Sequence, residues 1–169
     1  MGRYKTAGRR PCEKHTERNE DSGRAKKSAG GEIKTIASAL ICLALNVYSE
    51  SRGEPTAGQY AVAMVTLNRA NFKNENVCEE VFRPKQFSWT NSDVKRTRGG
   101  WALGPRHIPK DKKAWAAAKN VAALAMEGRI DDFTDGSTYF HEISAKPAWR
   151  KKMQRVVQVG HHVFYKVPS

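Results

Sequence analysis

The chain has few cysteines, and they are not spaced as a metal or redox motif. Its 169 residues include Cys12, Cys42 and Cys78, and no two of them form a Cys-x-x-Cys pair. Zinc knuckles and thioredoxin-type redox sites therefore lose their main sequence signal. Cys42 lies in an apolar run, where a small buried hydrophobic residue is expected. The three cysteines suit a protein that folds in a reducing cytoplasm.

Several catalytic motifs are also missing. There is no His-x-x-x-His, His-Glu-x-x-His, Gly-x-Ser-x-Gly or P-loop, so the sequence predicts no metal and no cofactor. Glu79 and Glu80 beside Cys78 would raise the pKa of its thiol, which opposes a cysteine peptidase. His161 and His162 are neighbours, so in a strand one is expected to be buried and the other solvated.

Long hydrophobic runs are absent as well. No apolar segment reaches the length of a membrane span, so no transmembrane segment is expected. The first 30 residues lack the apolar core of a signal peptide. We therefore expect synthesis in the cytoplasm without a signal peptide, and delivery by another agent to any target outside it.

Positive charge is abundant. The formal net charge is +13 and the isoelectric point is near 9.9, which predicts a polyanionic partner such as nucleic acid, an anionic membrane or an acidic wall polymer. Residues 1–31 contain nine Lys or Arg, four Asp or Glu and few large apolar residues. They are predicted to form a disordered basic tail, and residues 32–169 a single folded domain.

Helical patterns dominate the first part of the predicted domain. Apolar residues recur at three and four positions between residues 33 and 48, which predicts a helix buried on most sides and ended by Gly53 and Pro55. A capping-box pattern at residues 56–59 predicts a second helix to about residue 69. A short helix to residue 82 and an alanine-rich helix over residues 111–126 are also expected.

The remaining segments predict a long loop and a small sheet. Glycines and prolines punctuate residues 83–108, where a functional loop is expected. Residues 137–142, 154–159 and 161–167 have the character of short strands. The order predicts an α+β fold, dominated by helices, with a small antiparallel sheet.

Glu50 is the leading catalytic candidate. It ends the first predicted helix, where the negative end of the helix dipole disfavours an ionised carboxylate and raises its pKa. A carboxyl group that stays protonated is suited to general acid catalysis. Glu54 could be the second carboxylate of a glycosidase pair, or could pair with Arg52 or face solvent. Asp93 is a weaker candidate for that second carboxylate.

Two aromatic groups are candidates for binding a carbohydrate. The segment Gln86-Phe87-Ser88-Trp89 combines flat apolar rings with hydrogen-bonding groups, as sugars require, although an aromatic pair in the core is an equal alternative. Tyr139, His141 and Trp149 form a second aromatic group near the predicted sheet.

These motifs together resemble a known family. The sequence is similar, in content and order of motifs, to the cell-wall hydrolase family of the spore-cortex-lytic enzyme catalytic domain, SleB type. The matching motifs are residues 48–55, 58–59, 61–63, 67–69, 81–82, 86–89, 137–141, 147–149 and 159–165. The resemblance covers roughly residues 33–166. One departure is Thr138-Tyr139-Phe140-His141, where the family often has Thr-His-Tyr-His, so any role of that first histidine is lost.

The resemblance implies a lysozyme-like fold that cleaves peptidoglycan glycan strands, with Glu50 as the catalytic acid. We predict a lytic transglycosylase that cleaves the β-1,4 bond between N-acetylmuramic acid and N-acetylglucosamine and leaves 1,6-anhydro ends. An N-acetylmuramidase is the alternative within this class. The predicted substrate-binding residues are Gln86, Phe87, Ser88, Trp89, Tyr139, His141 and Trp149, with Arg52 and Glu54 in support.

The expected partner is the glycan strand, bound by a monomer with no specific nucleic acid. The basic chain without an export signal fits a phage endolysin or virion-associated lysin, released through a holin or injected. Two alternatives come from other classes. One is a nucleic-acid-binding protein that uses the tail and residues 85–106, with Trp89 stacking on bases. The other is a structural virion protein that has lost activity.

Overall fold

A layer of helices forms the centre of the molecule. The computed structural model describes residues 35–168, so the predicted tail over residues 1–31 lies outside the described residues. The helices are α1 (Ala39–Ser51), α2 (Thr56–Arg69), α3 (Asn74–Val81) and α4 (Lys112–Met126). Short 3-10 turns are η1 (Ser88–Thr90), η2 (Pro105–His107) and η3 (Ala148–Lys152).

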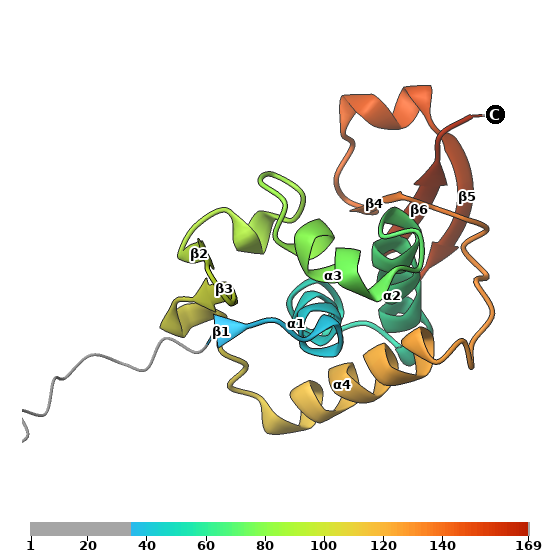
Figure 1. Ribbon diagram of the computed structural model, residues 1–169. Helices are drawn as coiled ribbons and strands as arrows, with labels where there is room; N and C mark the ends of the chain where they lie inside the picture. The colour runs from blue at the N-terminus through green and yellow to red at the C-terminus, as the bar shows by residue number, and fades with distance from the viewer. Residues whose placement is uncertain (1–34, 169) are drawn as a thin grey trace, which may run out of the picture. The chain divides into compact units, whose positions relative to one another are not determined.

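Two antiparallel sheets of three strands flank this layer at opposite ends in Figure 1. The first has the order β1-β3-β2 and consists of β1 (Thr35–Ile36), β2 (Val94–Thr97) and β3 (Gly100–Leu103). The second has the order β4-β6-β5 and consists of β4 (Tyr139–Glu142), β5 (Gln154–Val159) and β6 (His162–Lys166). The predicted α+β class is confirmed, and the predicted C-terminal strands form the second sheet.

The first sheet corrects two predictions. The helix expected from residue 33 begins only at Ala39, because Thr35 and Ile36 pair with Ala102 and Trp101 of β3. The loop expected over residues 83–108 contains the β2–β3 hairpin. These strands are too short to show alternation, and the partner that completes their sheet lies some 65 residues earlier in the chain.

The second helix begins as predicted but is not capped as predicted. Pro55 is its N-cap residue, and the Thr56 side chain makes no capping hydrogen bond. The Gln59 amide instead donates to the carbonyl oxygen of Glu54 at 3.0 Å. The capping-box prediction is therefore wrong, and the glutamine closes the turn that links α1 to α2.

The hydrophobic core surrounds α1, as expected for a helix buried on most sides. Leu43, Leu45 and Val47 of α1 are almost fully buried and pack against side chains of α2, α3 and α4. Burying each such side chain stabilises the fold by about 1.5–3 kcal/mol. A smaller cluster joins Val62 of α2 to Phe164 of β6. The two clusters hold α1 and the second sheet on opposite sides of α2.

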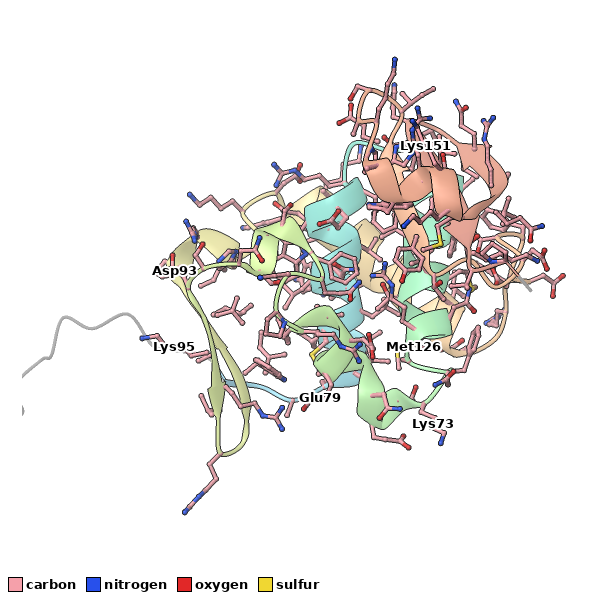
Figure 2. All side chains as sticks on the ribbon, turned by 90° about the horizontal axis from the view of Figure 1, so that it is seen from above. Lys73, Glu79, Asp93, Lys95, Met126 and Lys151 are labelled. Atoms are coloured by element: carbon pink, nitrogen blue, oxygen red, sulfur yellow. A yellow bond between two sulfur atoms is a disulfide. The ribbon has the colours of Figure 1, made fainter. Side chains whose placement is uncertain are left out.

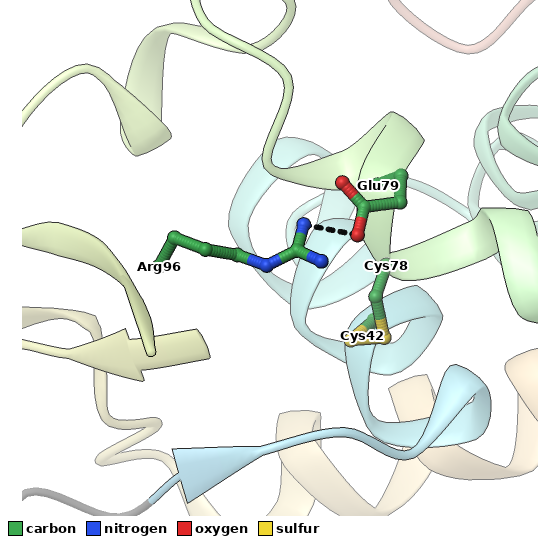
Figure 3. The surroundings of a disulfide bond; sticks show 4 residues. All are labelled: Cys42, Cys78, Glu79 and Arg96. Carbon is green, nitrogen blue, oxygen red and sulfur yellow. Dashed lines mark hydrogen bonds and ion pairs between the residues drawn. A yellow bond between two sulfur atoms is a disulfide. The ribbon is translucent and has the colours of Figure 1, made fainter. Parts of the chain in front are cut away.

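Cys42 is buried, as predicted, but a disulfide contradicts the expectation of a reduced protein. Cys42 of α1 is bonded to Cys78 of α3, and the ion pair between Glu79 and Arg96 lies beside the bond (Figure 3). The two cysteines are 36 residues apart in sequence, and only the packing of α1 on α3 brings them together. Closing a loop of this length stabilises the fold by roughly 3–4 kcal/mol in the chain-entropy description. The described chain therefore does not match the expectation of a fully reduced protein.

Within residues 35–168, every helix is too short or too polar to cross a bilayer.

Candidate active site

A cleft opens between the α1–α2 turn and the β5–β6 turn. Its volume is about 400 Å³, and it combines three carboxylates with two histidines. The residues that line it are Glu50, Ser51, Gly53, Glu54, Glu142, His161 and His162. The fold thus joins segments about 100 residues apart in sequence, and one of them is the helix end that the sequence singled out.

Glu50 lies in the last turn of α1, on the wall of this cleft. Burial raises the pKa of Glu50 to about 7, although the positive charge of Arg69 acts in the opposite direction. The direction agrees with the expectation from the helix end, but desolvation is the principal cause. At neutral pH a large fraction of Glu50 is protonated, so it can act as a general acid.

Glu54 has a different environment four residues later. Its carboxylate accepts hydrogen bonds from the backbone N–H of His161 at 2.9 Å and from His161 Nδ1 at 3.0 Å. Burial disfavours its ionised form, but these two bonds outweigh that effect and hold the pKa of Glu54 below its usual value. The expected pairing with Arg52 is wrong, because Arg52 lies over the Tyr48 ring instead.

Gly160 makes the clamp between Glu54 and His161 possible. Its φ of +57° lies in the left-handed region, and a Cβ at this position would lie 1.9 Å from Glu54 Oε2. Only glycine allows the carboxylate to approach the β5–β6 turn this closely. The clamp ties the end of α1 to the second sheet across the cleft.

The two adjacent histidines differ as predicted. The His161 side chain is 73% exposed, whereas His162 is buried. Burial lowers the pKa of His162, so its ring is neutral at neutral pH. Within residues 35–168 its Nδ1 has no hydrogen-bond partner, and the ring packs edge-on against Phe140.

A second cleft of about 370 Å³ surrounds Arg69. Gln86 and Tyr139, both predicted to bind substrate, line it. Arg69 Nε donates to the carbonyl oxygen of Thr138 at 2.5 Å, and its guanidinium lies 5.6 Å from the centre of the Tyr139 ring. With its amide oxygen turned toward Arg69, Gln86 accepts a hydrogen bond from Nη2 at 3.1 Å. Because Arg69 influences the pKa of Glu50, the two clefts are electrostatically coupled.

The other residues of the aromatic loop mainly support the site. Phe87 is 4% exposed and packs beneath Arg69. The Trp89 indole N–H donates to Asn46 Oδ1 at 2.9 Å, one helical turn before Glu50. Ser88 is exposed. Phe87 and Trp89 thus follow the alternative of core aromatics, and Trp89 holds the helix that carries Glu50.

His141 and Trp149 lie on the other face of the second sheet. His141 Nε2 is 3.0 Å from the Tyr165 hydroxyl, and Trp149 packs edge-on against both rings. Since adjacent residues of a strand point to opposite faces, His141 lies behind the sheet when Glu142 faces the Glu50 cleft. The structure does not bring His141 or Trp149 into that cleft.

Sequence reasoning missed three residues of the site. Glu142 shares the cleft with Glu50, Arg69 is coupled to Glu50, and Asn46 bridges Trp89 to Thr66, to which it donates at 2.9 Å. Strand alternation could have placed Glu142 on the buried face beside Phe140. No group of three or more His, Cys, Asp or Glu in residues 35–168 is arranged to hold a metal ion.

A glutamic acid whose pKa is raised to about 7 lies on a cleft between helices and a small sheet, which is the arrangement expected of a general acid. The profile of the Cell Wall Hydrolase family matches residues 53–165. The chain belongs to this family. The matched segment begins three residues after Glu50, so the family match does not include Glu50 itself.

Curated relatives are spore cortex-lytic enzymes. That of Halalkalibacterium halodurans is 31% identical over 125 residues, which are 72% of this chain and 33% of the relative. That of Bacillus cereus is 32% identical over 123 residues, which are 71% of this chain and 41% of the relative. This chain spans about a third to two-fifths of the length of these relatives.

Solved structures similar to this chain are catalytic domains. The catalytic domain of the germination-specific lytic transglycosylase SleB from Bacillus anthracis has a TM-score of 0.56 and 30% identity, over 76% of this chain and 93% of that domain. The catalytic domain of Bacillus cereus SleB has a TM-score of 0.53 and 29% identity, over 81% of this chain and all of that domain. The predicted SleB-type catalytic fold is confirmed.

Proposed function

We propose that this chain is a peptidoglycan lytic transglycosylase in which Glu50 serves as both catalytic acid and catalytic base. The observation that carries the proposal is the position of Glu50 on the cleft together with a pKa raised to about 7. Such a group is protonated often enough to donate a proton and basic enough to take one back. The lytic transglycosylase activity named for the similar Bacillus anthracis domain supports the assignment.

The proposed reaction proceeds in two steps. Protonated Glu50 donates its proton to the oxygen of the β-1,4 bond as the bond from C1 of N-acetylmuramic acid breaks, which leaves an oxocarbenium-like centre. The carboxylate of Glu50 then takes the proton of the C6 hydroxyl of the same sugar as O6 bonds to C1. The product is a 1,6-anhydro end, and Glu50 is protonated again. One carboxylate suffices because the nucleophile is already held by the sugar ring.

We propose that the glycan strand runs along the Glu50 cleft and the Arg69 cleft. Strand β4 borders both, with Tyr139 at one and Glu142 at the other, about 10 Å apart at the rise of a strand. The two side chains point to opposite faces of the sheet, so the glycan would pass over the edge strand β4 between the two clefts. Gln86 and Tyr139 are our candidates for contact with the sugars. Arg52 remains a candidate at the exposed rim, whereas Phe87 and Trp89 act by positioning Arg69 and α1.

A muramidase is the second candidate. A hydrolase needs a base to activate water, and Glu142 offers a second carboxylate in the Glu50 cleft. Glu54, the residue that sequence reasoning considered for this role, is less suited because His161 occupies both of its oxygens. The two reactions differ in their products.

The test is digestion of purified peptidoglycan followed by mass spectrometry of the fragments. We expect 1,6-anhydro ends from the wild type and a loss of products with Glu50→Gln. Glu127→Gln is the matched control, since Glu127 is an exposed glutamate at the end of α4. Reducing ends that disappear with Glu142→Gln would replace the transglycosylase by a muramidase. Undiminished activity in Glu50→Gln would refute both.

The biological setting remains our prediction. We propose a phage lysin that acts as a monomer on the wall after release through a holin or delivery by a virion. The competing nucleic-acid-binding function loses one of its supports, because the Trp89 ring packs against Phe82 and His107 and its N–H is bonded to Asn46. A base could not stack on it without displacing these contacts.

A further inference from the structure

The segment that follows β4 carries a concentration of unpaired positive charge. Residues 143–158 contain five Lys or Arg and no Asp or Glu. These five residues form the basic surface: Lys146, Arg150, Lys151, Lys152 and Arg155. None of them lies within 4.0 Å of a carboxylate in the part of the chain that the structure describes. Lys166 of the neighbouring β6, by contrast, pairs with Asp135.

Part of this surface is hollowed. Lys146, Arg150 and Arg155 converge on a cleft of about 280 Å³ whose inner side includes Tyr165. Arg155 donates to the amide oxygen of Gln158 at 3.1 Å, which holds its guanidinium at the cleft. The other two cations are exposed on η3, and Figure 2 shows Lys151 there, at the edge of the molecule.

The basic surface lies on the opposite face of the second sheet from the Glu50 cleft. Phe140 and Phe164 pack toward α2, whereas His141 and Tyr165 face this cleft. A ligand held here is therefore not the sugar at the reacting bond. The basic surface has no role in the proposed reaction.

We propose that the basic surface binds a linear phosphodiester polymer of the cell wall, of the poly(glycerol phosphate) type. Five cations spread over a cleft and the adjoining turn match a chain with regularly repeated negative charges better than a single carboxylate. Guanidinium forks and ammonium groups both bind phosphate oxygens well. Single-stranded nucleic acid fits less well, because the aromatic rings here are already engaged. The Tyr165 ring is buried and stacked on His141, and the Trp149 ring packs against Tyr139, His141 and Tyr165.

This inference depends on the proposed function only in placing the chain at a cell wall. Its test measures retention rather than cleavage, in full-length protein that carries Glu50→Gln so that the wall stays intact. The triple variant Lys146→Gln/Arg150→Gln/Arg155→Gln is compared with Lys110→Gln/Lys112→Gln/Lys113→Gln, which removes the same charge from an exposed segment elsewhere. Lys151→Gln/Lys152→Gln is the second variant, and thermal melting checks that each one folds.

Binding is measured to native walls, to walls from which acid has removed the phosphodiester polymers, and to vesicles with anionic lipids. On native walls, the basic-surface triple should bind about tenfold more weakly than its control, as expected for the loss of three cations from a contact with a polyanion. The double variant should show a smaller loss. On extracted walls, the two triples should bind equally.

Three results would overturn the proposal. Equal binding of both triples to native walls would leave the basic surface without a polymer ligand. A loss that persists on extracted walls would assign it to the peptide carboxylates. A larger loss on vesicles than on native walls would assign it to a membrane. Because every arm carries Glu50→Gln and measures binding rather than cleavage, none of these results bears on the chemistry proposed for Glu50.

Discussion

Glu50 and Glu54 are the same residue type on the same cleft, only four positions apart, and they have opposite electrostatic environments. Glu50 is half-buried and accepts no hydrogen bond from the described residues, so its neutral form is favoured. Glu54 accepts two hydrogen bonds from His161, so its ionised form is favoured. The contrast teaches that the hydrogen-bond donors a fold supplies, rather than burial alone, decide whether the neutral or the ionised form of a carboxyl group is favoured.

The largest expected difference between the two residues is in activity. Glu50→Gln should lower kcat by about 10²–10⁴-fold, because it removes the transferable proton. Glu54→Gln should lower kcat only by about tenfold, since it loosens the cleft wall without removing a reacting group. Release of soluble glycan fragments from purified walls measures both rates. Equal losses in the two variants would mean that the contrast in their environments has no catalytic meaning.

The two glutamates should also affect stability with opposite signs. The raised pKa of Glu50 means that its contribution to stability is present below about pH 4.5 and is lost as pH rises through about 7. Glu50→Gln should therefore be more stable than the wild type at pH 8, by up to about 3 kcal/mol, and not at pH 4.

Glu54 gives the reverse case. Its lowered pKa means that its contribution is present at neutral pH and is lost as pH falls through the pKa of the folded state. Glu54→Gln should be less stable than the wild type at pH 7, with the difference vanishing in acid. Urea denaturation at pH 4, 7 and 8 measures both variants, and parallel pH profiles for the two would contradict the assigned environments.

A substitution in the β5–β6 turn should disrupt Glu54 alone. Gly160→Ala places a Cβ against Glu54 Oε2, whereas Gly128→Ala, at a similar φ of +65°, meets nothing within 4 Å. Both variants carry the cost of a left-handed residue. Gly160→Ala should lose roughly 1–3 kcal/mol more, the value of hydrogen bonds to a charged group. Equal losses by urea denaturation would show that the clamp contributes nothing.

The smallest expected effect concerns the charge near Glu50. Arg69 lowers the pKa of Glu50 from the value that burial alone would set. Arg69→Gln should therefore shift the alkaline limb of the activity profile to higher pH, and Arg69→Lys, which keeps the charge, should leave it nearer its original place. The profile of kcat/KM against pH measures the shift. A limb that moves to lower pH in Arg69→Gln would exclude this coupling.

Local signals in the sequence predicted part of this molecule. Helix α2 and the strands of the second sheet have patterns that are complete within a few residues, and the α2 bounds were predicted closely. Glu50 could be singled out because a helix end, a glycine and a proline are all local features. Strand β1 could not be predicted, because two residues are too few to show an alternating pattern and the strand they pair with lies in a distant hairpin.

The partners within the site depend on long-range packing. The bond between Glu54 and His161 joins residues 107 positions apart, and nothing near either residue indicates the other. The same holds for Trp89 and Asn46, which are 43 positions apart. Sequence reasoning could therefore single out Glu50, but it could not foresee that Phe87 packs against Arg69 and that Trp89 is bonded to Asn46.

Because of the Cys42–Cys78 bond, the stability of the helical layer depends on the redox conditions of the compartment as well as on the sequence. The bond joins the first turns of α1 to α3, two turns before Glu50. It forms only where the thiol–disulfide balance is oxidising. The same polypeptide would therefore be a weaker structure among cellular reductants and a more durable one after transfer to an oxidising medium. The added stability would then come from a bond that forms after transfer, rather than when the chain first folds.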